Sequence, residues 1–98
     1  MDLSEKVYKL VSQIPKGRIT TYKIIAQKLG IKNYRLIGQI LKKNPQPIKI
    51  PCHRVIKSNG LIGGYQKGSN KKRQLLKKEG IVVKNDKVKN FKTLLKYF

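Results

Sequence analysis

Cys52, His53 and Arg54 bring a thiol, an imidazole and a guanidinium together in the sequence. The reactive form of a cysteine is the thiolate, and positively charged neighbours favour it. The imidazole can accept the thiol proton. The chain has 1 cysteine, so an internal disulfide and a zinc site built from several thiolates are excluded. The three residues predict a nucleophilic cysteine. The alternative is a cysteine buried as a small apolar side chain, because adjacent side chains need not face each other.

The charge of the chain indicates a polyanionic partner. Its 98 residues include 24 Lys and Arg against 4 Asp and Glu, which gives a net charge of +20. Such a field attracts nucleic acid and repels other copies of the chain. A lysine-rich composition also follows from base-composition bias or from adaptation to heat, so charge alone leaves the function open. The length allows one domain with one modest hydrophobic core.

The segment before Cys52 predicts three helices. Apolar residues recur at helical spacing in each, and each begins after a residue that can cap a helix. A short turn with a glycine separates the second from the third, which is typical of a helix-turn-helix but also of many other helical hairpins. The first helix begins with a capping box of Asp2 and Glu5 and stops at Pro15 and Gly17. The second, Tyr22–Leu29, follows Thr20 or Thr21 as its cap and stops at Gly30. The third covers residues 34–43 and is capped by Asn33.

Three prolines within residues 45–51 predict an extended and stiff approach to Cys52. Each proline ring fixes its own φ and lacks a backbone donor, which excludes a helix there. Residues 54–56 have strand character and residues 58–60 are a turn signal. We therefore expect residues 61–62 to return as the second strand of a β-hairpin.

Beyond this turn the sequence predicts one further clear helix and a tail. Ser69 can cap a helix over residues 70–79, and Gly80 ends it. Residues 81–98 hold a short β-like run, a turn and a last apolar cluster, and their structure is the least readable. We expect residues 1–98 to form a single, mainly α domain of the winged-helix-like or helix-turn-helix DNA-binding class. It would have a small β-hairpin, with about residues 81–98 as a C-terminal tail.

The surroundings of Cys52 resemble the active-site segment of a known family. The runs that carry the resemblance are NPQPIKIPCHRV, from Asn44, and SNGLIGGY, from Ser58, and both are similar to the O6-alkylguanine-DNA alkyltransferases. Similarity extends to GRITTYKIIAQKLG and YRLIGQILKKNP upstream and to KKRQLLKKEG downstream, so about residues 7–80 follow the catalytic domain of that family. Many members carry a separate N-terminal domain that this sequence lacks, so the chain resembles a free-standing catalytic C-terminal domain.

The resemblance implies a DNA-repair activity. Members of the family flip an alkylated guanine out of duplex DNA and transfer the alkyl group, such as methyl, from its O6 atom to a cysteine, once and irreversibly. No metal and no cofactor are implied, because the alkyl group is already activated by its bond to the base. The implied partner is double-stranded DNA containing O6-alkylguanine, with a helix over residues 34–43 in the minor groove and little sequence preference. Gln66 stands where some members have a small hydroxyl residue, which leaves the preferred alkyl group open.

The matching positions give each site residue an implied role. The implied catalytic residues are Cys52 as the alkyl acceptor, His53 as the base that takes its proton through a water, Glu79 as the group that orients this histidine, and Tyr22, which assists rotation of the nucleotide and protonates the leaving guanine. The implied substrate- and DNA-binding residues are Arg35 in the base stack, Asn44 at the turn before the active-site loop, Tyr65 and Gly64 at the guanine pocket, Lys72 as a charge near the leaving group, and Arg54 and Tyr34 as further contacts. Without the resemblance, Glu79 is a tolerated surface acid, Tyr22 a packing residue and Arg35 a phosphate contact.

Two other functions stay open. An alkyltransferase-like lesion binder would flip alkylated guanine with the same fold but transfer nothing. Such proteins typically have tryptophan or alanine in place of the cysteine, so Cys52 favours the enzyme. A winged-helix transcription regulator would use the turn at residues 58–60 as a wing and would prefer one operator sequence.

The N-terminal segment does not read as a signal peptide. Residues 1–13 carry two acids and two lysines at helical spacing and have no continuous apolar centre. Nowhere is an apolar run long enough to span a membrane. We expect a cytoplasmic monomer that binds DNA, does not bind a membrane and needs no obligate protein partner.

Overall fold

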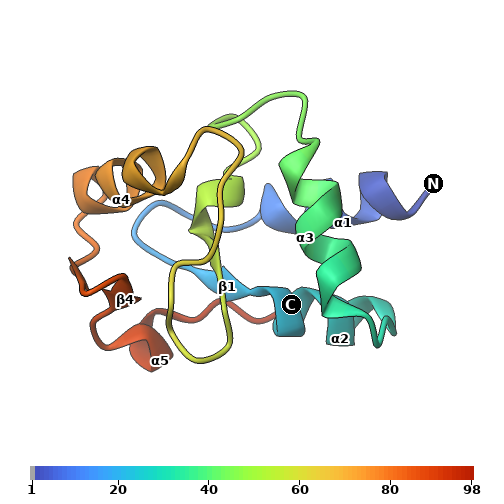
Figure 1. Ribbon diagram of the computed structural model, residues 1–98. Coiled ribbons are helices and arrows are strands. Elements are labelled where there is room, and N and C mark those ends of the chain that lie inside the picture. Colours follow the sequence, from blue (N-terminus) through green and yellow to red (C-terminus); the bar gives the residue numbers. More distant parts are fainter. Residues whose placement is uncertain (1) are drawn as a thin grey trace.

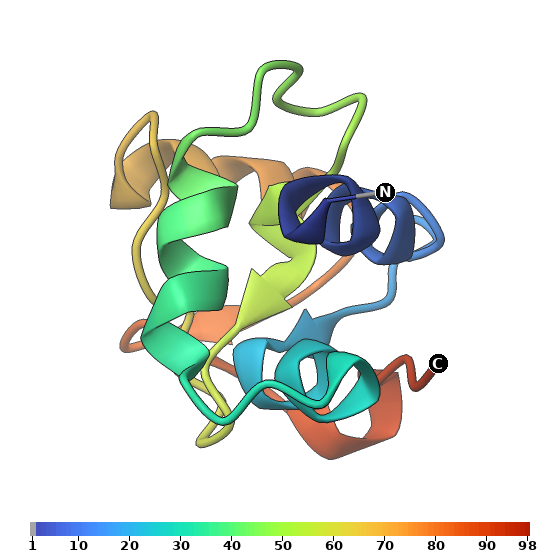
Figure 2. The ribbon, with the colours of Figure 1, turned by 90° about the vertical axis from the view of Figure 1, so that its right-hand side faces the viewer.

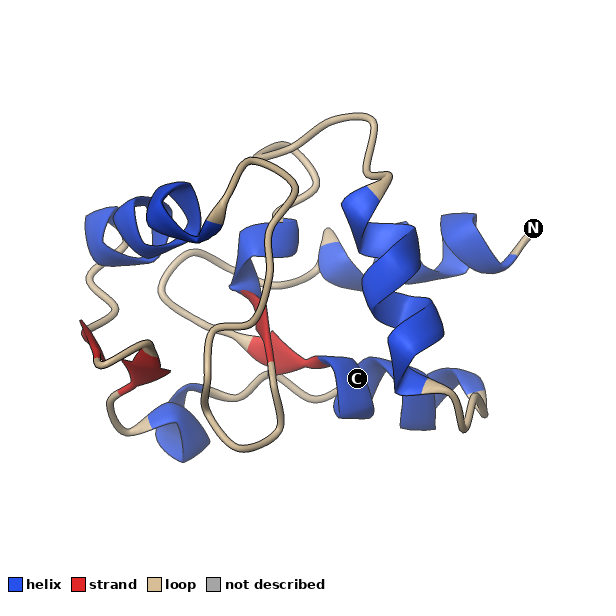
Figure 3. Cartoon of the chain, viewed as in Figure 1, coloured by secondary structure: helices blue, strands red, loops and turns tan. Residues whose placement is uncertain are grey.

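The computed structural model describes residues 2–98 as a mainly helical chain with two short pairs of strands (Figures 1 and 3). The helices are α1 (Leu3–Val11), α2 (Tyr22–Leu29), α3 (Tyr34–Lys42), the 3₁₀ helix η1 (Cys52–Arg54), α4 (Ser69–Lys78) and α5 (Phe91–Leu94). The strands are β1 (Thr20–Thr21), β2 (Val55–Ile56), β3 (Val83–Lys84) and β4 (Lys87–Val88). None of the helices within residues 2–98 is long and apolar enough to cross a membrane.

The first three helices begin where their capping residues predict. Asp2, Thr21 and Asn33 each accept a hydrogen bond from the backbone N–H three residues later, at 2.9, 3.0 and 3.3 Å. Each cap satisfies a backbone donor that has no partner inside its helix. Gly30 ends α2 in the left-handed conformation, with φ 71°. The three predicted N-termini and the predicted stop of α2 are therefore confirmed.

The helices enclose two hydrophobic cores, one on each side of the strand pair β1–β2. Helices α1, α2 and α3 pack against one another at one end of the molecule, and α4, β4 and α5 lie at the other end (Figures 1 and 2). The first core is built by the buried residues Val7, Leu10, Val11, Ile14, Ile25, Ala26, Ile37, Ile40, Leu41, Cys52, Val55 and Tyr65. The second core is built by Ile19, Ile56, Ile62, Leu76, Ile81 and Val88. Cys52 thus belongs to the core formed by the three N-terminal helices.

The predicted hairpin of residues 54–56 with residues 61–62 is wrong. Strand β2 pairs in parallel with β1, with Thr20 opposite Val55 and Thr21 opposite Ile56. The turn at residues 58–60 is present, but the returning Ile62 donates its backbone N–H to Asp86 in the C-terminal segment. Parallel pairing buries Val55 and Ile56 completely, which a solvated two-stranded hairpin would not do.

The approach to Cys52 turns sharply instead of extending. Within residues 45–51 the Ile50 N–H donates to the Gln46 carbonyl at 2.9 Å, and Ile48 takes a positive φ of 80°. The exclusion of helix by the prolines is confirmed, but the extended conformation is wrong. Hydrogen bonds that close this loop outweigh the local preference for extended backbone.

Helix α4 begins one residue earlier than predicted. Ser69 is inside the helix, and Gly68 occupies the capping position without a side-chain bond. Lys78 is the last helical residue, Glu79 is the C-cap, and Gly80 follows with φ 84° as the predicted stop.

The C-terminal segment is ordered and docks on the start of the chain. Strands β3 and β4 form an antiparallel hairpin, so the small hairpin of the predicted fold class occurs in this segment and not after Cys52. Further on, the Ile19 N–H donates to the Leu94 carbonyl at 3.0 Å, and the Lys96 N–H donates to the Ile19 carbonyl at 2.6 Å. The Arg18 guanidinium donates to the Leu94 and Leu95 carbonyls. Leu94 and Leu95 of this segment pack against the second core, which contains Ile19.

Candidate active site

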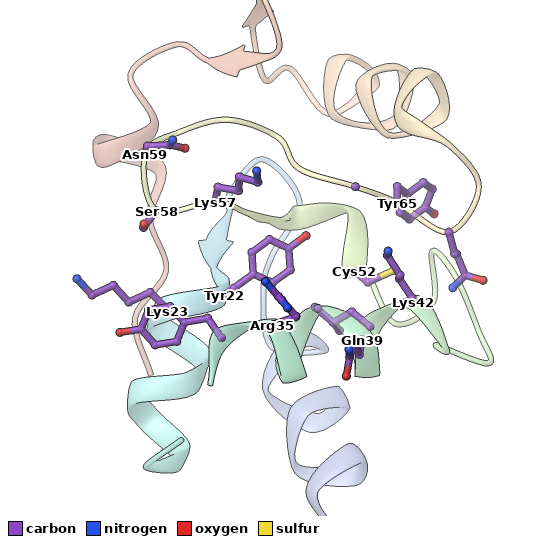
Figure 4. Close-up of a pocket in the computed structure, with 15 residues that line it drawn as sticks. Tyr22, Lys23, Arg35, Gln39, Lys42, Cys52, Lys57, Ser58, Asn59 and Tyr65 are labelled. Carbon is purple, nitrogen blue, oxygen red and sulfur yellow. The ribbon is translucent and has the colours of Figure 1, made fainter. Parts of the chain in front are cut away.

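Cys52 lies in the wall of a cavity of about 600 Å³. It is the first residue of η1, and its backbone N–H donates to the Ile50 carbonyl at 2.7 Å. Its exposed fraction is 5%, so the thiol is buried but faces the cavity (Figure 4). A nucleophile in this position can reach a molecule that enters the cavity but is shielded from bulk solvent.

Six of the residues predicted for the site line this cavity together. Helix α3 forms one side, the start of α2 another, and the loop of residues 57–66 a third (Figure 4). The predicted residues among the lining are Cys52, Tyr22, Tyr34, Arg35, Gly64 and Tyr65. Aromatic rings, a thiol and exposed polar groups converge here, as expected of a binding site for a planar ligand.

His53 and Glu79 form a pair outside the cavity lining, in which His53 is buried and Glu79 is partly exposed. The His53 Nε2 atom lies 3.0 Å from the Glu79 Oε2 atom, and His53 has no exposed surface. Burial lowers the pKa of His53, although the contact with Glu79 opposes this shift. Burial tends to raise the pKa of Glu79, but hydrogen bonds from Arg54 and His53 hold it below its ordinary value. The neutral imidazole and the ionised carboxylate are thus the favoured forms.

His53 keeps one ring nitrogen free for proton transfer. Nδ1 is buried and makes no hydrogen bond to any group within residues 2–98, and the same holds for the Tyr65 hydroxyl. The two rings meet edge to face with centroids 6.5 Å apart. Because Nε2 contacts Glu79, Nδ1 is the nitrogen that can accept a proton.

Arg54 supports Glu79 and does not line the cavity. Its guanidinium donates to both Glu79 oxygens, at 2.9 and 2.6 Å, and to the Ile14 carbonyl at 2.7 Å. All of these bonds are partly buried, and the Arg54 side chain is only 15% exposed. The structure therefore places Arg54 with the His53–Glu79 pair, whereas the resemblance gave it a contact to DNA.

Lys72 is not among the residues that line the cavity. It is fully buried, and its Nζ atom donates to the Val55 carbonyl at 2.7 Å and the Gly64 carbonyl at 3.1 Å. Nζ also lies 5.8 Å from the centroid of the Tyr22 ring. Burial lowers the pKa of Lys72 to about 7 and raises the pKa of Tyr22 to about 12. The two hydrogen bonds of Lys72 thus connect β2 with the loop that contains Tyr65. Tyr22 keeps its phenolic proton at neutral pH and can donate it.

Asn44 holds the loop before Cys52. Its Nδ2 atom donates to the Ile50 carbonyl at 2.8 Å, and its Oδ1 atom accepts from the Gln46 N–H at 2.9 Å. The Gln66 side chain donates to the Asn44 carbonyl at 3.0 Å. These bonds connect the loop that leads to Cys52 with the loop opposite it.

The sequence profile of one protein family matches most of the chain. It is described as "6-O-methylguanine DNA methyltransferase, DNA binding domain" and matches residues 2–81. The chain belongs to this family.

Curated proteins named methylated-DNA–protein-cysteine methyltransferase are similar to most of this chain. A methylated-DNA–protein-cysteine methyltransferase of Saccharolobus solfataricus is 51% identical over 77 residues, which cover 79% of this chain and 50% of the relative. One of Candida glabrata is 44% identical over 86 residues, which cover 87% of this chain and 42% of the relative. The chain spans about half the length of the curated relatives it matches.

Solved structures of the family share the fold. The Mycobacterium tuberculosis OGT in complex with DNA superposes with a TM-score of 0.78 at 38% identity, over 82% of this chain and 49% of that chain. S. pombe Atl1 in complex with damaged DNA containing O6-carboxymethylguanine superposes with a TM-score of 0.83 at 29% identity, over 100% of both chains. The predicted fold class, mainly α with a helix-turn-helix, is confirmed.

The cavity of this family member also has lining residues that the sequence reasoning missed. Gly38, Gln39 and Lys42 line it from α3, on the same face as Arg35. Their spacing of three, four and seven residues after Arg35 is the helical period, which would have found them once Arg35 was chosen. Gly63, one of the two glycines before Tyr65, packs against Tyr22: a Cβ atom there would lie 3.3 Å from the Tyr22 hydroxyl, and φ is 74°.

Proposed function

We propose that this chain removes an alkyl group, such as methyl, from the O6 atom of guanine in duplex DNA by transferring it to Cys52, once and irreversibly. The observation that carries the proposal is the placement of Cys52 in the wall of the 600 Å³ cavity, beside Tyr22 and Tyr65. Membership of the 6-O-methylguanine DNA methyltransferase family and the names of the curated relatives support it. On this account the chain corresponds to the catalytic domain of the longer relatives.

DNA would approach over the exposed side of α3. The O6 atom of a stacked guanine is out of reach of a buried thiol, so the damaged nucleotide must rotate out of the helix into the cavity. Arg35 and Tyr34 lie exposed near the start of α3 and line the cavity, so they would meet the duplex where the base leaves the stack. The net charge of +20 provides nonspecific attraction to the phosphates.

The transfer is a displacement at the alkyl carbon. His53 takes the thiol proton through a water at Nδ1, and Glu79 holds the ring through Nε2. The Cys52 thiolate then attacks the alkyl carbon, a C–S bond forms, the bond from carbon to O6 breaks, and its electron pair passes to O6. Tyr22 supplies a proton to the leaving guanine. The thioether has no route back to a thiol, so each molecule acts once.

A labelled substrate tests this proposal. The protein is incubated with an excess of duplex that carries O6-methylguanine with a radiolabelled methyl group, and label bound to the protein is counted. We expect a plateau at one methyl group per molecule and no label on a Cys52→Ser variant. No label on the wild-type protein would overturn the proposal.

A lesion binder without transfer is the second candidate. The observation that favours it is the match to Atl1 over the full length of both chains, in a structure that contains damaged DNA. Cys52 favours the enzyme, because a binder has no use for a thiol in the cavity wall. A protein that binds O6-methylguanine duplex more tightly than unmodified duplex but takes up no label would be such a binder.

A further inference from the structure

The tip of the loop that forms one side of the cavity, residues 57–60, is small and polar. Lys57, Ser58 and Asn59 of this loop tip line the cavity and are exposed. Gly60 follows with a φ of 92° and donates its backbone N–H to the Lys57 carbonyl at 3.0 Å. A segment of this composition buries little apolar surface of its own, so its order depends on contacts with other segments.

The C-terminal segment supplies such contacts. The Val88 N–H donates to the Gly60 carbonyl, and the Ile62 N–H donates to the Asp86 carbonyl, both at 2.9 Å. Figure 4 shows the loop tip, with Asn59, beside the faint ribbon of this segment. The family profile ends at residue 81, so the contacts come from a segment beyond the matched residues.

Phe91 of α5 lies directly against Gly60. A Cβ atom built on Gly60 would lie 2.6 and 2.8 Å from the Cδ1 and Cε1 atoms of the Phe91 ring, closer than van der Waals contact allows. The ring therefore occupies the place that a side chain would take at this position. Phe91 also packs against the second core, which contains Ile62 and Val88. The loop tip is thus connected through Phe91 to that core.

The same loop packs beside Tyr22. A Cβ atom on Gly63 would lie 3.5 Å from the Lys57 Cγ atom, in addition to its contact with the Tyr22 hydroxyl. Lys57 belongs to the loop tip, and both Lys57 and Tyr22 line the cavity. A displacement of the loop tip would therefore change the cavity wall beside Tyr22.

We propose that Phe91 is a positioning residue for alkyl transfer, because it holds the loop tip in place before a rotated-out nucleotide enters the cavity. The inference rests on the proposed transfer to Cys52. Ordering a mobile loop during binding costs conformational entropy, and a loop that is already held avoids this cost. Phe91 does not line the cavity, so it acts through the loop tip. Its loss should impair entry of the nucleotide and leave the thiol unchanged.

Two reactions of Cys52 separate these effects. Transfer from duplex that contains O6-methylguanine requires the nucleotide to enter the cavity, whereas alkylation by iodoacetamide requires only an accessible thiol. Phe91→Ala is compared with Leu94→Ala, which removes an apolar side chain that belongs to the same helix and packs on the same core. Phe91→Tyr keeps the ring. Phe91→Leu keeps an apolar side chain but lacks the flat ring, and it replaces the alanine variant if that variant does not fold.

We expect Phe91→Ala to slow single-turnover transfer about tenfold, the cost of ordering roughly one loop residue. Its reaction with iodoacetamide should keep the wild-type rate, and so should both reactions of Leu94→Ala and Phe91→Tyr. Three results would overturn the inference and leave the proposed function standing: transfer by Phe91→Ala at the wild-type rate, equal slowing by Leu94→Ala, or equal slowing of both reactions in Phe91→Ala. Absence of transfer by the wild-type protein would overturn the proposed function and the inference together.

Discussion

The Glu79 carboxylate lies 3.0 Å from His53 Nε2, although 26 residues separate the two in sequence. Glu79 is the C-cap of α4, where a negative charge opposes the helix dipole. Two hydrogen bonds from Arg54 and the contact with His53 offset that cost. The end of α4 thereby fixes the orientation of His53, the residue that follows Cys52.

Glu79→Gln should destabilise the protein. The change leaves the largely buried Arg54 guanidinium without a charged partner, and we expect the free energy of unfolding to fall by about 2–4 kcal/mol. Asp86→Asn is the matched control, because it breaks the exposed pair with Arg73 and should cost no more than about 1 kcal/mol. Urea unfolding measures both. Equal losses in the two variants would show that the Glu79 network adds nothing beyond a surface ion pair.

Glu79→Gln should also change how the stability of the protein depends on pH. The pKa of Glu79 is lowered in the folded protein, so the unfolded chain binds the proton more tightly. The stabilisation is therefore complete above the ordinary pKa of 4.5 and is lost as pH falls through the folded value. Glu79→Gln should lose less stability than the wild-type protein over the same acid range, and an identical acid loss would contradict this assignment.

Transfer should weaken in acid because His53 must be neutral to accept a proton. Burial lowers the pKa of His53 below 6.5, so the rate should be constant near neutral pH and fall at a pH below that value. His53→Gln should slow transfer about 10²–10⁴-fold and remove this acid limb. Single-turnover rates measured across the acid range decide the point. A variant that keeps the wild-type acid limb would remove His53 from the proton path.

Lys72→Met should remove a rise of stability with alkaline pH. The folded pKa of about 7 is below the ordinary 10.5, so between these values the unfolded chain binds a proton that the folded protein does not. Stability from this group therefore rises with pH through that window, by up to about 1.4 kcal/mol per pH unit. The difference in unfolding free energy between wild-type protein and Lys72→Met should grow accordingly. The exposed Lys71→Met is the control, and a difference that stays flat with pH would contradict the buried position of the amine.

Arg35→Ala should slow transfer from duplex DNA but not from the free base. Unstacking the nucleotide costs a few kcal/mol, and a side chain that fills the gap lowers that cost, so we expect about a 10–100-fold slower reaction with duplex. Free O6-alkylguanine needs no flipping and should react at the wild-type rate. Lys32→Ala, exposed and outside the cavity lining, controls for lost charge. Equal slowing with duplex and free base would assign Arg35 to pocket structure instead.

Local signals predicted the helices well. Asp2, Thr21 and Asn33 are short polar residues just before apolar periodic runs, and a cap depends only on the three residues that follow it. Gly30 and Gly80 likewise end helices through their own backbone freedom. Such features need no knowledge of distant segments.

The pairing of β2 with the distant strand β1 could not be predicted from the sequence. Val55 and Ile56 have the same strand character whether they pair with residues 61–62 or with β1. Pairing with β1 is favoured because it buries Val55 in the first core and Ile56 in the second, and these cores are built by residues distant in the sequence. The burial of Lys72 could not be predicted for the same reason. Its hydrogen-bond acceptors, the Val55 and Gly64 carbonyls, lie outside its own helix. Arg54 lies beside Glu79 for a similar reason.

The mass of the reacted protein shows whether Cys52 accepts the alkyl group. Wild-type protein is incubated with duplex that contains O6-methylguanine, and the intact chain and its proteolytic peptides are weighed. We predict a gain of one methyl group, located on the peptide that contains Cys52, and no gain with unmodified duplex. An unchanged mass, or a methyl group on any other residue, would contradict transfer to Cys52.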